Sequence, residues 1–195
     1  MDDKYYVKDG KNYTRVTSIL GYFKNPSLVK WYLKVGAKEA KRISTIAMKR
    51  GTSVDDAIRL HVEEGKVPKF KTEEEKNCFN AYLQWREDYS VKDIHSATTQ
   101  FDDEALIAGT PDLWLPDETV DIKCASSIRE NYWLQTEWYA RKKGHNFKSI
   151  LRLDSNLGCY EYVRKPVSDY EFQIFEALVS VYRFYNAIPT EPEEE

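Results

Sequence analysis

The sequence has few cysteines and no long hydrophobic run, and both shortages exclude broad classes of protein. Its three cysteines, Cys78, Cys124 and Cys159, are an odd number at wide and irregular spacing. This spacing matches neither a disulfide framework nor a zinc clip, so we expect reduced thiols in a cytoplasmic, intracellular protein. No stretch approaches the roughly 18 apolar residues of a membrane span, and the N-terminus lacks the apolar core of a signal peptide. We therefore expect a soluble, unprocessed protein that does not contact membranes.

The chain also lacks internal repeats, and its one biased segment is the acidic stretch at residues 189–195. A chain of 195 residues with 42% hydrophobic and 14% aromatic content can bury one core but is short for two domains. We predict a single domain over residues 1–188, with a helical N-terminal part at about 14–90 and the sheet at about 91–187. The acidic stretch is predicted to be a disordered tail.

Positive charge is unevenly distributed along the chain, although the net charge is only -3. Between Lys30 and Arg50 there are seven cations and a single acid, Glu39. Such a segment is typical of a surface that contacts phosphates, and a solvated helix face is the alternative interpretation.

Helical patterns dominate the first half of the chain after a hairpin signal at residues 5–13. Residues 17–22 favour a short helix, and the helical pattern restarts at residues 26–27. A long helical pattern covers residues 37–64, and we predict that it breaks at Gly51.

Two capping boxes mark predicted helix starts in the same half. Thr52 with Asp55 has the spacing of a capping box just after the expected break. Thr72 with Glu75 has the same spacing and opens an amphipathic pattern that continues to about residue 89.

The second half of the chain changes to short strand-like stretches. Strands are predicted at residues 94–101, 106–115, 119–124, 148–154 and 159–164, and helices at residues 131–143 and 168–186. Ser168 with Glu171 has the spacing of a capping box at the start of the last helix. This order predicts an α/β fold with a mixed central sheet flanked by helices and preceded by an N-terminal helical addition.

Carboxylates on two neighbouring predicted strands form the candidate catalytic centre. The motif Gly109-Thr110-Pro111-Asp112 is followed nine residues later by Asp121-Ile122-Lys123. Strands joined by a short turn lie about 4.8 Å apart, so Asp112 and Asp121 can share a divalent cation. Lys123 is two residues from Asp121 and faces the same side. Mg²⁺ or Mn²⁺ there would polarise a phosphate and activate a water, while Lys123 orients that water or stabilises developing charge.

The alternative interpretation is structural. Asp112 would then be a turn residue, and Asp121 and Lys123 would be exposed on an edge strand. However, Val120 and Ile122 indicate a central strand, where an unpaired charge is costly unless it binds something. We therefore favour the catalytic interpretation.

A third motif follows twelve residues after Lys123, where Gln135 and Tyr139 lie on one face of a predicted helix. Together, GTPD, DIK and QxxxY resemble the RecB-type branch of the PD-(D/E)XK nuclease superfamily over about residues 13–165. The chain is similar in layout to mitochondrial genome-maintenance exonucleases, helicase-nuclease domains and phage exonucleases. The resemblance implies a restriction-endonuclease-like αβββαβ core and a Mg²⁺- or Mn²⁺-dependent DNA nuclease, an exonuclease rather than a sequence-specific endonuclease. It also suggests a phage or bacterial protein of DNA repair or recombination, with a recombination or replication protein as a further partner.

The resemblance also implies roles for single residues. The metal ligands would be Asp112, Asp121 and the main-chain carbonyl of Ile122, the catalytic lysine would be Lys123, and Gln135 with Tyr139 would position DNA or the active site. The cations expected to bind DNA are Lys38, Lys41, Arg42, Lys49 and Arg50.

Two positions depart from the family pattern. Asp55 stands where many relatives have a metal-binding histidine, so it is either a metal ligand or the capping-box residue described above. We expect nearby His61 to be an exposed helical residue. Cys124 follows DIK where relatives often have threonine, and we expect it to be a small core residue.

Two other functions remain open. A catalytically inactive nuclease fold could serve as a DNA-binding or assembly module, although the retention of Asp112, Asp121, Lys123 and Gln135 together argues against decay. A metal-binding regulatory protein is disfavoured by the basic segment. The choice between single- and double-stranded DNA, the strand polarity and the oligomeric state do not follow from the sequence.

Overall fold

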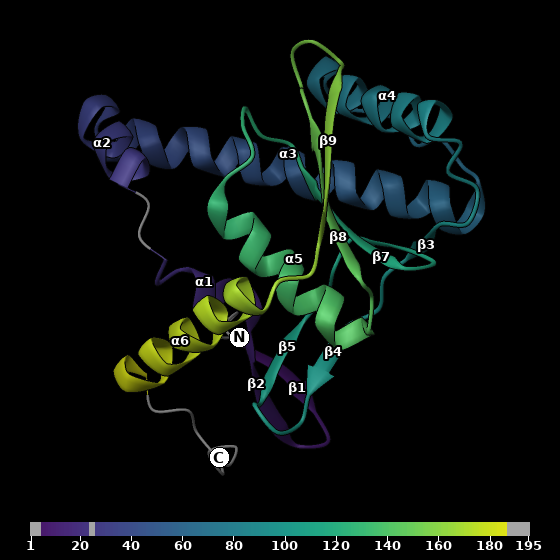
Figure 1. The fold of residues 1–195 in the computed structure, drawn as a ribbon. Helices are drawn as coiled ribbons and strands as arrows, with labels where there is room; N and C mark the ends of the chain where they lie inside the picture. The colour runs from purple at the N-terminus through teal and green to yellow at the C-terminus, as the bar shows by residue number, and fades with distance from the viewer. Residues whose placement is uncertain (1–4, 24–25, 187–195) are drawn as a thin grey trace.

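The computed structural model describes residues 5–23 and 26–186 and has two mixed β-sheets surrounded by helices (Figure 1). The helices are α1 (Val16–Leu20), α2 (Pro26–Val35), α3 (Ala37–Glu64), α4 (Glu73–Asp88), α5 (Glu130–Lys143) and α6 (Asp169–Tyr185). The strands are β1 (Tyr5–Lys8), β2 (Lys11–Arg15), β3 (His95–Ser96), β4 (Gln100–Asp102), β5 (Ile107–Gly109), β6 (Leu113–Leu115), β7 (Glu118–Lys123), β8 (Phe147–Leu153) and β9 (Tyr160–Pro166). The predicted fold class is confirmed, whereas the acidic tail lies outside the described residues.

The predicted αβββαβ order of elements is found in and around the larger sheet. Its strands lie in the order β3-β6-β7-β8-β9. Strands β6 and β7 are antiparallel and joined by a short turn, whereas β7 and β8 are parallel. A parallel pair requires a crossover connection, and α5 provides it. Helix α3, the strands β3, β6 and β7, helix α5 and strand β8 therefore follow the αβββαβ order, and β7 lies in the middle of the sheet.

The smaller sheet has the order β1-β2-β5-β4 and corrects two strand predictions. The stretch 94–101 was expected to be one strand, but its ends belong to β3 and β4 in different sheets. The stretch 106–115 likewise divides into β5 and β6. The chain leaves the smaller sheet after Gly109, and Pro111 has no N–H for a ladder bond, so the GTPD motif forms the crossing between the sheets.

Helix α3 is continuous, so the predicted break at Gly51 is wrong. The Thr52 hydroxyl donates back to the Met48 carbonyl instead of capping a new helix. A glycine inside a helix costs about 1 kcal/mol relative to alanine. Burial of Val54 and Ile58 in the core offsets this local cost, because tertiary packing supplies most of a helix's stability.

The other two predicted caps are confirmed. The Thr72 side chain accepts a hydrogen bond from the Glu75 N–H at the start of α4. Ser168 accepts in the same way from the Glu171 N–H at the start of α6.

Two hydrophobic cores lie on either side of the larger sheet. The first packs the second half of α3 and helix α4 against residues such as Val120, Ile122 and Leu151. The second packs α1, α5 and α6 around Trp138, Phe175 and related side chains. Because strand residues alternate, Asp121 and Lys123 point away from the first core and towards α5.

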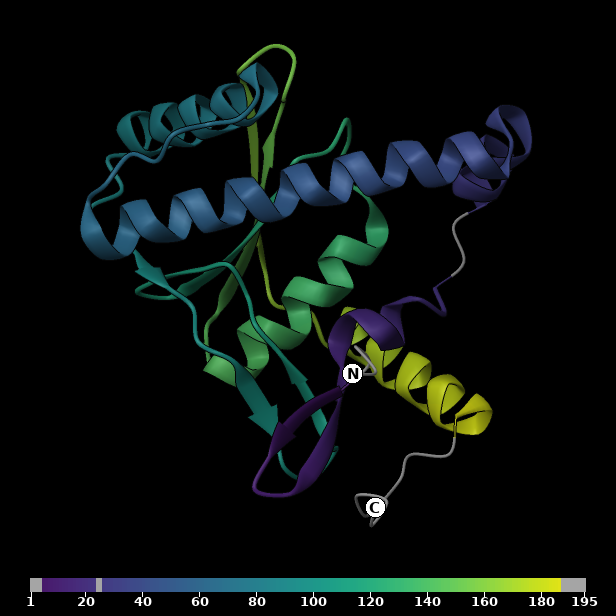
Figure 2. The ribbon, with the colours of Figure 1, turned by 180° about the vertical axis from the view of Figure 1, so that it is seen from behind.

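Helix α2 differs from the rest of the fold because it buries none of its residues. Both views show α2 and the first half of α3 reaching beyond the sheets (Figures 1 and 2). None of the helices that the structure describes is long and apolar enough to cross a membrane. All three cysteines are free, as predicted.

Candidate active site

Asp112, Asp121, Lys123 and Asp55 come together at the place where the two sheets separate. Asp112 lies between β5 and β6, Asp121 and Lys123 lie on β7, and Asp55 comes from α3. A cavity of about 190 Å³ opens here, and its walls include Asp55, Asp112 and Ile122 together with Arg59. The structure thus gathers residues that are up to 68 positions apart in the sequence.

Asp112 is fixed by the strand beside it. Its Oδ2 atom accepts a hydrogen bond from the Ile122 N–H at 2.6 Å. In an extended strand the N–H and C=O of one residue point to the same side, so the Ile122 carbonyl also faces Asp112. The predicted pairing of a carboxylate with this carbonyl therefore fits the strand geometry.

Asp121 and Lys123 form a buried ion pair. Asp121 is 1% exposed, and the Lys123 Nζ atom lies 2.6 Å from its Oδ2 atom. Beyond this contact, Asp121 Oδ2 has no hydrogen-bond partner among the described residues. The Lys123 ammonium also lies 5.1 Å from the centre of the Tyr132 ring. The pair leaves acceptor capacity on Asp121 unused.

The electrostatics of the site reflect an excess of negative charge. Burial raises the pKa of Asp112 well above its usual range, and Asp55 and Asp121 raise it further. Burial also raises the pKa of Asp121, and that of Asp55 to about 7. Burial alone would lower the pKa of Lys123, but the neighbouring carboxylates outweigh it and raise that pKa. Three carboxylates face one ammonium, so a further cation would stabilise their charged forms.

The donor atoms fit a partly hydrated Mg²⁺ or Mn²⁺ rather than a closed metal cage. Within residues 5–23 and 26–186, no three histidine, cysteine or acidic side chains are arranged to hold a metal on their own. The available donors are hard oxygens from Asp112, Asp121, Asp55 and the Ile122 carbonyl. Mg²⁺ commonly takes one or two protein carboxylates and keeps several waters. The unused acceptor on Asp121 is consistent with such an ion.

Gln135 and Tyr139 approach the site from α5. The Gln135 amide donates to the Tyr139 hydroxyl at 3.4 Å, and Tyr139 is 2% exposed. The Tyr139 ring packs directly on Gly109, where an added Cβ would lie 2.7 Å from the ring carbon Cε1. Gly109 therefore joins the GTPD motif to the QxxxY motif, a role that the sequence interpretation missed. A glycine inside a strand was the available signal for such a close approach.

The predicted DNA-binding cations do not line this cavity. Lys38, Lys41, Arg42 and Lys49 are exposed along the first half of α3, and Arg42 is paired with Glu39.

Arg50 differs from these four cations. Its side chain is half-buried, and its Nε atom is buried with no hydrogen-bond partner among the described residues. The role of Arg50 in DNA binding therefore stays a prediction. Less of its side chain is exposed to meet DNA than in the other four cations.

Two other sequence expectations concern His61 and Cys124. His61 is half-buried rather than exposed, because its ring packs on Phe79 and lies 3.3 Å from the Tyr82 hydroxyl. It does not line the cavity. Cys124 packs against the first core, as expected, and is half-buried.

Tyr132 and Arg129 are site neighbours that the sequence did not single out for this role. Arg129 lies 6.0 Å from the Tyr132 ring, whose face Lys123 also approaches. The contact depends on the approach of α5 to β7, and no local pattern encodes it.

No protein-family model matches the sequence, and no curated protein matches it. Among solved structures, SSO0001 is similar with a TM-score of 0.50 and 10% identity, over 94% of this chain and 80% of that one. This likeness supports the fold and carries no activity.

Two exonuclease structures are also similar, at lower scores. An alkaline exonuclease from Laribacter hongkongensis aligns with a TM-score of 0.49 and 12% identity, over 69% of this chain and 78% of that one. A phage-related exonuclease from Haemophilus somnus aligns with a TM-score of 0.42 and 12% identity, over 68% of this chain and 79% of that one. Likenesses at this level assign no substrate to this chain.

Proposed function

We propose that this protein is a metal-dependent DNA nuclease of the RecB-type PD-(D/E)XK superfamily. The observation that carries the proposal is that Asp112, on the wall of the cavity, lies close to the ion pair of Asp121 and Lys123, with more negative charge than one lysine balances. The αβββαβ order around β7 supports the same conclusion, because it positions DIK in the central strand.

Asp112, Asp121 and the Ile122 carbonyl would hold Mg²⁺ or Mn²⁺, with Asp55 as a further ligand. The ion would supply Lewis-acid activation of the scissile phosphate and of a water. Asp55 is no longer explained as a helix cap, because α3 passes through it without a break. Its position on the cavity wall beside Asp112 supports the ligand role.

Lys123 would act as a proton-bearing cation rather than as a base. The carboxylates around it keep its pKa above the usual range, so its ammonium stays charged at neutral pH. A charged ammonium donates hydrogen bonds and stabilises negative charge that develops on a phosphate oxygen. Tyr132 and Asp121 restrict where that ammonium can lie.

Gln135 and Tyr139 would position the site from α5. The Tyr139 hydroxyl accepts from Gln135, and the ring is held against Gly109 in the strand that leads to Asp112. Exposed cations on the first half of α3 would contact DNA phosphates without reading sequence.

We further propose that cleavage begins at a DNA end. Helix α2 and the first half of α3 stand beyond the sheets and would form a wall beside the cavity. A site walled in this way would admit a strand by its terminus, because an internal phosphate would have to pass the wall to reach the carboxylates.

The test is incubation with end-labelled linear DNA and covalently closed circles, in single- and double-stranded form, with and without Mn²⁺. The proposal expects cation-dependent loss of label from linear DNA and survival of circles. Rapid opening of closed single-stranded circles would indicate an endonuclease. DNA binding without any cleavage in Mn²⁺ would favour the inactive binding module instead.

A further inference from the structure

A strongly cationic projection lacks an acidic partner within the described residues. The cationic arm, residues 26–49, comprises α2 and the first half of α3 and carries six cations and one acid. That acid, Glu39, is already held by the Arg42 guanidinium at 2.7 and 2.9 Å. The five remaining cations form no ion pair with the described residues: Lys30, Lys34, Lys38, Lys41 and Lys49.

The arm also exposes apolar surface. Leu33 is 81% exposed, Met48 is 69% exposed, and no residue of α2 is buried. A helix with no buried residue gains little from packing on its own fold, because tertiary packing supplies most helical stability. This arm is therefore a surface that a further segment or molecule can cover.

The end of α6 contacts the segment of chain that precedes this arm. Asn186, which follows α6, donates to the Tyr22 hydroxyl at 2.6 Å. The Tyr22 ring also contacts Tyr182 and Tyr185, with centroids 5.5 and 5.9 Å away. Tyr22 precedes the first residue of α2, Pro26, by only four positions. The chain therefore leaves α6 close to the start of α2.

The chain that follows Asn186 is acidic and long enough to reach the arm. Residues 187–195 carry four glutamates and no cation: Glu191, Glu193, Glu194 and Glu195. Nine extended residues span up to roughly 30 Å, and the four residue steps from Tyr22 to Pro26 span at most roughly 14 Å. The reach left after subtracting the second span from the first is close to the length of α2, since ten helical residues rise roughly 15 Å. The glutamates at the end of the sequence can thus reach Lys30 and Lys34.

We infer that the acidic segment, residues 187–195, binds the cationic arm of its own chain and competes there with polyanions. Opposite charge favours the contact, and tethering to α6 gives the segment a high effective concentration at the arm. Competition with nucleic acid rests on the proposed function, whereas the contact between segment and arm does not. Because the pairs are solvent-exposed, salt should weaken the contact strongly.

Carbodiimide cross-linking of the full chain at low salt tests the contact directly. We expect amide cross-links between the acidic segment and Lys30 or Lys34, located by mass spectrometry and lost in 0.5 M salt. Exposed lysines elsewhere, such as Lys69 and Lys92, are the internal reference. Equal cross-linking to the reference lysines would overturn the inference. Mixing heavy-isotope and ordinary chains separates the sources, and links found only between chains would also overturn it.

Oligonucleotide binding without divalent cations tests the competition. Changing Glu191, Glu193, Glu194 and Glu195 to glutamine should tighten binding of a labelled single strand on the order of threefold to tenfold at low salt, and much less at high salt.

The matched control neutralises four exposed acids outside the segment: Glu63, Glu74, Glu87 and Glu104. An equal gain in the control would show that net charge alone is responsible and would overturn the competition. If neither form bound the oligonucleotide, the proposed function would fail, and the cross-links would still decide the contact.

Discussion

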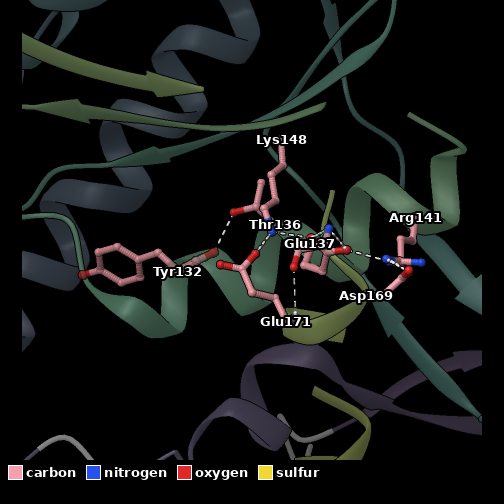
Figure 3. A network of polar contacts seen from close by, with 8 residues as sticks. Tyr132, Thr136, Glu137, Arg141, Lys148, Asp169 and Glu171 are labelled. Carbon is pink, nitrogen blue, oxygen red and sulfur yellow. Dashed lines mark hydrogen bonds and ion pairs between the residues drawn. The ribbon is translucent and has the colours of Figure 1, made fainter. Parts of the chain in front are cut away.

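Two buried charged regions next to α5 differ in how completely their charges are paired. Around Lys148, which is fully buried, the ammonium contacts both Glu137 and Glu171 (Figure 3). Glu137 also accepts from the Arg141 Nε at 2.6 Å and from the Ser168 N–H at 3.0 Å. Each buried group in this network has several partners. The network ties α5 to β8 and to the start of α6.

The candidate active site has the same kinds of groups but incomplete pairing. Beyond its contact with Lys123, a buried oxygen of Asp121 has no hydrogen bond from the described residues, and three carboxylates share the single ammonium of Lys123. Their pKa values rise because burial and mutual repulsion disfavour the charged forms. A buried charge without compensation is costly, so the comparison indicates that one region holds the fold and the other is built to receive a ligand.

The largest expected effect is on catalysis in the incompletely paired region. Asp121→Asn should reduce cleavage at least on the order of a thousandfold, because it removes a carboxylate of the proposed metal site. It should not lower the melting temperature, since burial already disfavours the Asp121 carboxylate. Cleavage assays and thermal melts of the same preparations check both parts. The control is Asp169→Asn, which changes an exposed carboxylate of the Lys148 network and should keep full activity. Equal cleavage by Asp121→Asn and the wild type would refute the assignment.

The second effect is on stability in the fully paired region. Glu137→Gln should lower the free energy of unfolding by about 3 kcal/mol, because it leaves the buried Lys148 with one carboxylate fewer. Urea denaturation measures the loss. Glu130→Gln, on the exposed start of the same helix, should change stability by less than about 0.5 kcal/mol. A Glu137→Gln protein as stable as the wild type would remove the distinction between the two regions.

The third effect concerns the contact that links the site to α5. Gly109→Ala should lower stability by about 1–3 kcal/mol, because its new Cβ would overlap the Tyr139 ring. Cleavage should also fall at temperatures where the variant is folded. Gly51→Ala is the matched control, since a Cβ there meets open space in α3 and should stabilise by up to about 1 kcal/mol. Similar behaviour of the two variants would contradict the close packing of Gly109.

The smallest effect is a pH dependence from Asp55. The pKa of Asp55 is about 7 in the folded protein and 3.8 in the unfolded chain. Between these two pH values the folded protein therefore keeps a proton on Asp55 that the unfolded chain has lost. This contribution to stability is fully present below pH 3.8 and is lost as the pH rises towards 7. Relative to Asp55→Asn, the metal-free wild type should therefore lose about 1–2 kcal/mol between pH 6 and pH 8. Parallel pH profiles in denaturation experiments would contradict the burial of this carboxyl.

The sequence predicted what depends on local patterns. The order of the strands, the caps at Thr72 and Ser168, and the closeness of Asp112 to Asp121 follow from short-range periodicity and spacing. The continuity of α3 through Gly51 did not follow, because tertiary packing of the second half of the helix decides it.

Contacts between distant elements were also missed. The Lys148 network joins three elements, and a lysine in the strand pattern gives no sign of its partners. Tyr139 on Gly109 and Lys123 on Tyr132 likewise depend on the docking of α5, which no local pattern specifies.

Titration with Mn²⁺, followed by calorimetry or electron paramagnetic resonance, tests the central claim most directly. The wild type should bind Mn²⁺, and binding should be lost in Asp121→Asn and Asp112→Asn. Glu137→Gln, below its melting temperature, should bind like the wild type, because its carboxylate is already occupied by Lys148, Arg141 and Ser168. Lys123→Met should retain most of the binding, since this lysine contacts Asp121 but offers no oxygen that would hold the ion. Mn²⁺ binding that is unchanged in Asp121→Asn, or absent from the wild type, would contradict the claim that the incompletely paired region is a metal site.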